Sequence, residues 1–275
     1  MRIYVSVDIE GIAGVTSRRH SAMDGPEYAR ARLWMTGTAV AAANAALAAG
    51  AREVVVSDGH AKKENIDIDR LPRGCTLVRG TPRPFGMMQG IEDGEYAAAF
   101  MLGYHAGASA FGGVLAHTYN GRALSEIRVN GRVANEAFIN AALAGSFGVP
   151  VALVSGDDVF AEEVSHFLPQ AEAVVVQKSH GVYAATAMVP EDAEAAIAIA
   201  VTKALGAVDG FKPFVLEPPI VVELDFKHRM VAELLAYVPW FDRYAPYSVR
   251  FTAPTMAEAY RTLTFLLNYS VSLQD

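Results

Sequence analysis

Acidic and histidine side chains recur in this chain where short apolar segments end. Residues 2–7, 53–57, 97–102 and 113–117 form such segments, and each is predicted to be a buried strand. The polar residues at these ends, with the first acid of a helix expected near 135–146, are Asp8, Glu10, Asp58, His60, His105, His117 and Glu136. Because parallel strands end at one edge of a sheet, these side chains should meet there. Carboxylates with neutral imidazoles are the ligands expected for zinc or a similar divalent ion.

Each of these residues also has an ordinary structural explanation. A turn, a helix cap, a first-turn acid or a buried histidine bonded to the backbone would account for any one of them. Glu10 reaches the same site as Asp8 only if the backbone bends, which Gly11 permits. The common position at strand ends, rather than any single residue, therefore predicts the metal site.

The expected cluster is large enough for two metal ions. Two carboxylates from the first strand end, two histidines and one further carboxylate can hold two divalent ions about 3.5–4 Å apart. Such a pair lowers the pKa of a bridging water and polarises a carbonyl or phosphoryl oxygen. The predicted reaction class is hydrolysis.

The elements that must position these residues alternate between strand and helix. Helices are expected over residues 26–49, 135–146 and from Pro190 to about 205, and further strands over 75–79, 151–154 and 173–176. Short strands that are apolar on both faces indicate a mostly parallel sheet covered on both sides, a three-layer α/β/α fold. The regular alternation of strands and helices ends near Pro190. We therefore predict an α/β metal-binding catalytic domain over 1–188 and a smaller α+β domain over 189–275.

Composition excludes several other classes of protein. The chain of 275 residues has a net charge of -7 and no basic block, which argues against a nucleic-acid partner. A single cysteine, Cys75, excludes an internal disulfide framework and a cysteine-based zinc finger. The longest apolar run, 38–49, is too short to span a bilayer, and the N-terminal segment lacks the features of a signal peptide. We expect a cytoplasmic protein with no membrane partner.

An ordered set of short motifs resembles the M55 peptidase family, the zinc-dependent D-aminopeptidases also called dipeptide transport proteins. The first is Ser6-Val7-Asp8-Ile9-Glu10-Gly11, similar to the SxDxEG motif of that family. The others follow in the family's order: Ser57-Asp58-Gly59-His60, Met101 to Ala106, Ala116-His117-Thr118, and Val129-Asn130-Gly131 with Glu136. These matches cover roughly residues 1–190.

The resemblance implies a ligand set, a substrate and an assembly. It implies that Asp8 bridges two zinc ions per subunit, that Glu10 and His105 complete one, and that His60 and Glu136 complete the other. It makes His117 the catalytic residue, either as a nucleophile or as a general acid/base that shuttles a proton. It further implies release of N-terminal D-amino acids from short peptides by a homodecamer of two stacked pentameric rings.

Other functions remain open at this point. A dinuclear amidase or phosphoesterase would use similar ligands, although no basic cluster is present for a phosphate, and a non-catalytic peptide-binding protein is a further alternative. Asp157 and Asp158 are expected to cap the helix near Phe160, with a role near the substrate as the alternative. Lys178 ends a predicted strand and is either a solvated lysine or an anchor at the edge of the site.

Overall fold

A seven-stranded sheet forms the larger part of the molecule. The computed structural model describes residues 1–269. The strand order is β3-β2-β1-β4-β7-β8-β9, parallel except for the antiparallel pair β8 and β9. The strands are β1 (Arg2–Val7), β2 (Glu53–Asp58), β3 (Cys75–Val78), β4 (Tyr96–Leu102), β7 (Val151–Asp157), β8 (Glu172–Gly181) and β9 (Ala184–Ala187). The central strands β1, β2, β4 and β7 are buried almost throughout, which explains their unbroken apolar character.

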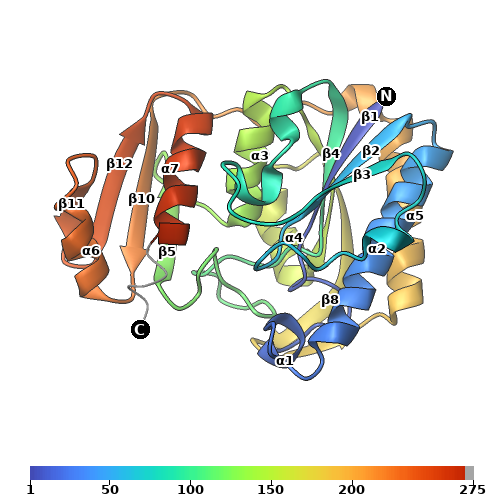
Figure 1. The fold of residues 1–275 in the computed structure, drawn as a ribbon, viewed down its shortest axis with the longest axis horizontal. Coiled ribbons are helices and arrows are strands. Elements are labelled where there is room, and N and C mark those ends of the chain that lie inside the picture. Colours follow the sequence, from blue (N-terminus) through green and yellow to red (C-terminus); the bar gives the residue numbers. More distant parts are fainter. Residues whose placement is uncertain (270–275) are drawn as a thin grey trace.

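Helices cover both faces of this sheet, so the three-layer α/β/α prediction is confirmed (Figure 1). On one face, α2 (Tyr28–Ala48) packs against α5 (Pro190–Gly206) and over Ile3 and Val5 of β1. On the other face, α3 (Glu136–Ser146) and α4 (Asp158–Ser165) share a core with Tyr4. Alternate residues of β1 thus belong to opposite cores, as the two-residue period of a strand requires.

A second sheet lies beside the first and is entirely antiparallel. Its order is β11-β12-β10-β5-β6. The strands are β5 (Leu124–Val129), β6 (Arg132–Val133), β10 (Ile220–Phe226), β11 (Asp242–Ala245) and β12 (Ser248–Ala253), with α6 (Arg229–Leu235) alongside. The last helix, α7 (Met256–Tyr269), contacts β10 and β12 and also α3, so it joins the second sheet to the first (Figure 1).

Several elements depart from the expected organisation. The hairpin predicted at Asn130-Gly131 is present, with both residues at positive φ, but its strands β5 and β6 belong to the second sheet. Conversely, α5 packs on the first sheet although it follows residue 188. The domain boundary at 188 stays a prediction, because each side of it contributes elements to the part of the fold formed mainly by the other. Residues 270–275 of the predicted second domain lie outside the described part of the chain.

The segment 113–117 is not a strand, so that prediction was wrong. It lies in an irregular loop, where Val114 donates its backbone N–H to Asp157 and Leu115 donates to the Val182 carbonyl. Its apolar side chains are buried by this loop packing instead of by a sheet.

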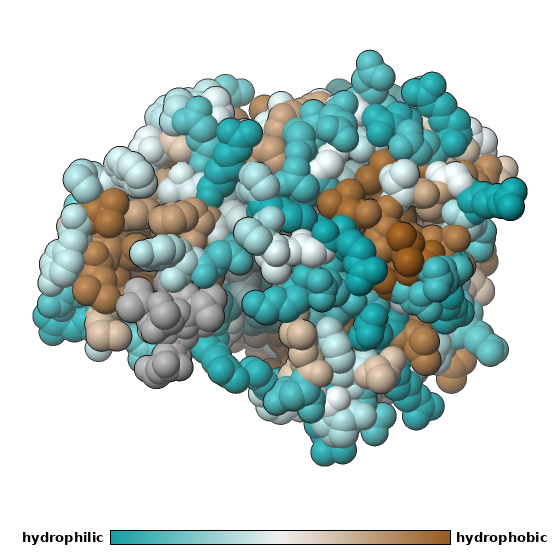
Figure 2. Space-filling view, in the orientation of Figure 1, coloured by the Kyte–Doolittle hydropathy of each residue, from teal (hydrophilic) through white to brown (hydrophobic). Residues whose placement is uncertain are grey.

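The remaining elements are short. They are α1 (Arg18–Ser21) and the 3-10 turns at Ile68–Arg70, Gly86–Met88, Ile91–Asp93 and Val208–Gly210. Within residues 1–269, none of the helices combines the length and apolarity needed to cross a membrane. Figure 2 shows that hydrophilic side chains cover most of one face, with separate apolar patches over the second sheet and over the larger part.

Candidate metal centre

The sheet order brings three predicted ligand positions together. Strand β1 lies between β2 and β4, and Val7 at its end pairs with Asp58 on one side and Leu102 on the other. Asp8, His60 and His105 follow these three strand ends. The expectation that the carboxyl ends of parallel strands would gather these residues is therefore met by the geometry.

The backbone after β1 turns sharply at Gly11. Its N–H donates to the Gly103 carbonyl, and a Cβ built on Gly11 would lie 1.8 Å from the Tyr104 carbonyl oxygen. Only glycine allows so close an approach of two backbones. The resulting turn places Glu10 on the same side as Asp8, so both carboxylates face one site.

Two groups of side chains share this site. Asp8, Glu10 and His60 form one group, and His105, His117 and Glu136 form the other, each with possible ligand atoms within 4.8 Å of one another. His60 Nδ1 lies 2.9 Å from Glu10 Oε2 and 3.4 Å from Asp8 Oδ1. His105 Nε2 lies 3.3 Å from Glu136 Oε1 and 3.4 Å from Asp8 Oδ2. Asp8 is thus the carboxylate that both groups share.

The division of the ligands between the two expected ions stays a prediction. Glu10 lies with His60, and His105 lies with Glu136, whereas the opposite pairing was expected from the family resemblance. In the sheet, β2 and β4 lie on opposite sides of β1, and His60 and His105 follow these two strands. The role of Asp8 between the two groups is unaffected.

Backbone carbonyls orient both histidines. His60 Nε2 lies 2.7 Å from the Ser21 carbonyl oxygen, and His105 Nδ1 lies 3.0 Å from the Ala106 carbonyl oxygen. A carbonyl oxygen only accepts, so these outer nitrogens donate, and the inner nitrogen of each neutral ring presents a lone pair to the carboxylates. This is the arrangement that metal-ligating histidines adopt.

Burial and charge shift the pKa values of the central groups. Burial alone would raise the pKa of Asp8, but the close approach of the His105 and His60 imidazoles outweighs it and holds that pKa well below its usual value. Burial would lower the pKa of both histidines, but Glu10 with Asp8 raises that of His60, and Glu136 with Asp8 raises that of His105. Without a metal ion, these shifts favour an ionised Asp8 and protonated His60 and His105.

Unpartnered buried atoms show that these residues fit a metal ion. Asp8, Glu10, His105 and Glu136 are at most 6% exposed. Glu10 Oε2 and His105 Nε2 make no hydrogen bond of good geometry to any described residue. Buried carboxylates and imidazole nitrogens that converge without hydrogen-bond partners are stabilised by a divalent cation.

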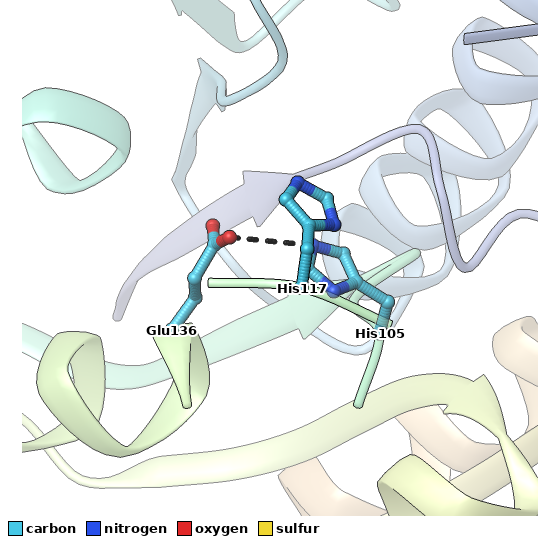
Figure 3. A group of neighbouring side chains, drawn as sticks. All are labelled: His105, His117 and Glu136. Atoms are coloured by element: carbon cyan, nitrogen blue, oxygen red, sulfur yellow. Dashed lines mark ion pairs between the residues drawn. The ribbon is translucent and has the colours of Figure 1, made fainter. Parts of the chain in front are cut away.

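Glu136 is the first residue of α3. The Asn135 side chain caps this helix by accepting the N–H of Phe138, and Glu136 Oε1 accepts the N–H of Tyr119 at 2.7 Å. Glu136 therefore occupies the first turn of a helix, where a carboxylate interacts favourably with the helix dipole. The same carboxylate also faces His105 (Figure 3).

His117 reaches the site from a loop instead of from a strand end. Its ring stacks on that of His105, with centroids 4.1 Å apart and planes 5° from parallel (Figure 3). Its Nδ1 lies 2.8 Å from the Leu115 carbonyl oxygen, so Nδ1 donates and Nε2 of the neutral ring carries a lone pair. His117 is less buried than His105 and lines a cavity next to the carboxylates.

The other polar residues singled out in the sequence have supporting positions. Asp58 is fully buried and accepts backbone N–H groups of the 58–66 loop, so it shapes the turn that carries His60. Asp157 caps α4 as expected and also holds Val114. Asp158 accepts the N–H of Ser179. Lys178 is exposed and lines no cavity found at the site.

Several residues at the site were not singled out in the sequence, and Lys63 is the charged one among them. Lys63 lines the same cavity as Asp8 and Glu136, although it lies in a polar loop that offers no pattern to single it out. Its neighbour Lys62 is exposed and does not line that cavity. Only the fold distinguishes the two lysines.

Known proteins are similar to this chain in both sequence and fold. The family model of peptidase M55, described as D-aminopeptidase, matches residues 1–265. A D-aminopeptidase of Bacillus subtilis (strain 168) is 31% identical over 264 residues, which are 96% of this chain and 95% of that protein. A solved structure, the "Zn-dependent D-aminopeptidase DppA from Bacillus subtilis, a self-compartmentalizing protease", has a TM-score of 0.93 and 30% identity, covering 98% of this chain and 97% of that one. The chain therefore belongs to the M55 peptidases, the D-aminopeptidase family.

Proposed function

We propose that this protein is a zinc-dependent aminopeptidase that removes N-terminal D-amino acids from short peptides. One observation carries the proposal: the buried His105 and the largely buried His60, each oriented by a backbone carbonyl, point a nitrogen at opposite oxygens of the Asp8 carboxylate. Family membership supplies the activity, and the solved relative is described as zinc-dependent.

The geometry supports a specific set of ligands. Asp8, Glu10 and His60 would hold one zinc ion, and Asp8, His105 and Glu136 the second. When bound, such ions polarise the scissile carbonyl, stabilise its developing negative charge and lower the pKa of water. The protein holds the carboxylates in fixed positions through Gly11, Tyr119 and the α3 N-terminus.

His117 is proposed to move the proton. Because its Nδ1 donates to Leu115, the free Nε2 can take a proton and later deliver it to the leaving amine. The family's alternative is direct attack by this imidazole. Its place beside His105 and Glu136 also suits a third metal ligand, so the roles require a test that separates turnover from metal content.

The test of the proposed function is a paired measurement. Purified protein is analysed for zinc, and hydrolysis of matched D-alanyl and L-alanyl dipeptides is followed with and without a chelator. We expect bound zinc and chelator-sensitive cleavage of the D-alanyl peptide. A generic phosphate ester serves as the second substrate: cleavage of the ester alone would identify a phosphoesterase, and zinc without cleavage of either would identify a binding protein.

Zinc binding should become stronger as the pH rises from 6 to 8. In the metal-free protein the raised pKa values of His60 and His105 contribute stability at pH values below about 6.5, and this stability is lost as the pH rises through the raised values. The lowered pKa of Asp8 contributes stability above about pH 4, lost as the pH falls through the lowered value. Zinc requires neutral imidazoles, so it must displace these protons.

Thermal unfolding of zinc-loaded and zinc-depleted protein checks this expectation. The difference in Tm between the two forms should widen over that pH range, and calorimetric titration in buffers of different ionisation enthalpy should detect released protons. A Tm difference independent of pH would contradict it.

We also propose that the protein assembles into a homodecamer of two pentameric rings in the cytoplasm. The solved relative is described as self-compartmentalizing, which supports an oligomer. Large aromatic side chains are exposed, among them Phe111, Tyr237 and Trp240, the last two being 74% and 71% exposed. Exposed apolar groups of this size suit contacts between copies, although their arrangement in a ring is part of the proposal.

A further inference from the structure

A small cavity beside the metal centre contains one cationic side chain. The cavity has a volume of about 320 Å³, and its walls include Asp8, His60, Glu136 and His117. On the opposite side it is lined by Tyr260 and Thr264 of α7. Among the described residues, Lys63 is the only lysine or arginine that lines it.

The Lys63 ammonium has unused hydrogen-bonding capacity. Its Nζ donates to the Ala61 carbonyl oxygen at 3.2 Å, and no carboxylate within residues 1–269 lies at ion-pair distance. An ammonium carries three donors, so at least one remains for a ligand in the cavity.

The loop holds Lys63 in a fixed relation to the metal ligand His60. Lys63 has a φ of 60°, its N–H donates to the His60 carbonyl at 2.7 Å, and its own carbonyl accepts the Gly80 N–H at 2.7 Å. A left-handed conformation is unfavourable for a lysine and persists only where such contacts impose it. Strained positions of this kind cluster at ligand sites.

Charge selects the part of a substrate that would approach Lys63. Asp8, Glu10 and Glu136 carry three negative charges, and the two divalent ions of the proposed centre would more than neutralise them. With Lys63 the cavity is then cationic, which disfavours a peptide's ammonium and favours its carboxylate. The volume lies at the small end of ligand sites, about 300–1,000 Å³, and suits a peptide of few residues.

We propose that Lys63 anchors the terminal carboxylate of a short peptide whose first peptide bond lies at the metal centre. This inference rests on the proposed aminopeptidase function and adds to it a residue that selects substrates by length. Both contacts lie in one cavity of about 320 Å³, so the scissile bond and the carboxylate must be close along the chain. A dipeptide meets this requirement, since its carboxylate lies one residue beyond the scissile bond, about 3.8 Å along the chain.

The test compares free acids with amides in matched variants. Lys63→Met keeps an unbranched side chain of similar length and removes the charge, and Lys62→Met makes the same change at the exposed neighbouring lysine. Each protein is assayed with D-alanyl-D-alanine and with its C-terminal amide. Calorimetry with the reduced-bond analogue, in which CH2–NH replaces CO–NH, measures the binding of acid and amide without turnover.

We expect wild type and Lys62→Met to prefer the free acid by about 10- to 100-fold, the range of one charge-assisted hydrogen bond. Lys63→Met should lose this preference because kcat/KM falls far more for the acid than for the amide, and the remaining cleavage of the amide also shows that the variant is folded. Lys63→Arg should retain part of the preference. Equal loss for acid and amide, or a wild type that does not distinguish them, would overturn the anchor.

The binding arm keeps the two proposals separable. If wild type cleaves no D-alanyl peptide but still binds the analogue's acid more tightly than its amide in a Lys63-dependent way, the aminopeptidase function fails and the anchor stands. If cleavage is normal but binding of the acid is indifferent to Lys63, the function stands and the anchor fails.

Discussion

Replacement of His117 by alanine should reduce turnover of a D-alanyl dipeptide by about 10² to 10⁴-fold, the contribution of a positioned general acid/base. Its Nε2 carries the free lone pair, since Nδ1 is committed to the Leu115 carbonyl. The substitution leaves the proposed metal ligands in place because His105 is oriented by Ala106 and Glu136 by Tyr119. Zinc content should therefore remain at the wild-type level.

Steady-state kinetics with elemental analysis of the same samples checks this result. His180→Ala is the matched control, because His180 is exposed on β8 and bonded to Thr186. Loss of one zinc ion together with activity would assign His117 to the His105–Glu136 ion as a ligand. Retained activity would remove His117 from the mechanism altogether.

Replacement of Asp8 by asparagine should abolish both metal binding and activity. Asp8 contributes one oxygen to each group, at 3.4 Å from His60 Nδ1 and 3.4 Å from His105 Nε2. An amide of the same shape lacks the charge that compensates two divalent ions, and it brings N–H groups toward lone pairs. No other carboxylate of the two groups faces both histidines.

Glu10→Gln provides the contrast, because Glu10 contacts His60 but not His105. Zinc-to-protein ratios of about two for wild type, about one for Glu10→Gln and near zero for Asp8→Asn are expected from the two groups. Atomic absorption on dialysed protein measures these ratios. Equal loss in both variants would show that the ions bind only as a pair, and full zinc content in Asp8→Asn would contradict the shared position.

The positions of Asp8, His60 and His105 were predictable because parallel strands impose a common edge. That rule needs only the location of each strand end, which the apolar runs mark clearly. The short distance between Glu10 and His60 was not predictable in this way. It depends on β1 lying between β2 and β4. The hydrophobic periodicity of a single strand does not reveal which strands lie beside it in the sheet.

His117 and Lys63 show a second limit. Both lie in loops whose shape is set by distant contacts, such as those of Val114 with Asp157 and of the Lys63 carbonyl with Gly80. An apolar stretch such as 113–117 can be buried either in a strand or in a packed loop. Its composition therefore does not distinguish a strand from a loop. The placement of β5 and β6 in the second sheet likewise depends on a partner far along the chain.

The pairing of β5 with the distant strand β10 affects the order in which the protein folds during synthesis. The hairpin of β5 and β6 leads directly into Glu136, yet β5 pairs with β10, and Asn130 bonds to Val221 across 91 residues of chain. A nascent chain leaving the ribosome therefore carries all five proposed metal ligands long before β10, the strand that pairs with β5, is synthesised. Pairings of such long range form slowly and leave an open edge in the meantime, so the metal centre is completed late in folding.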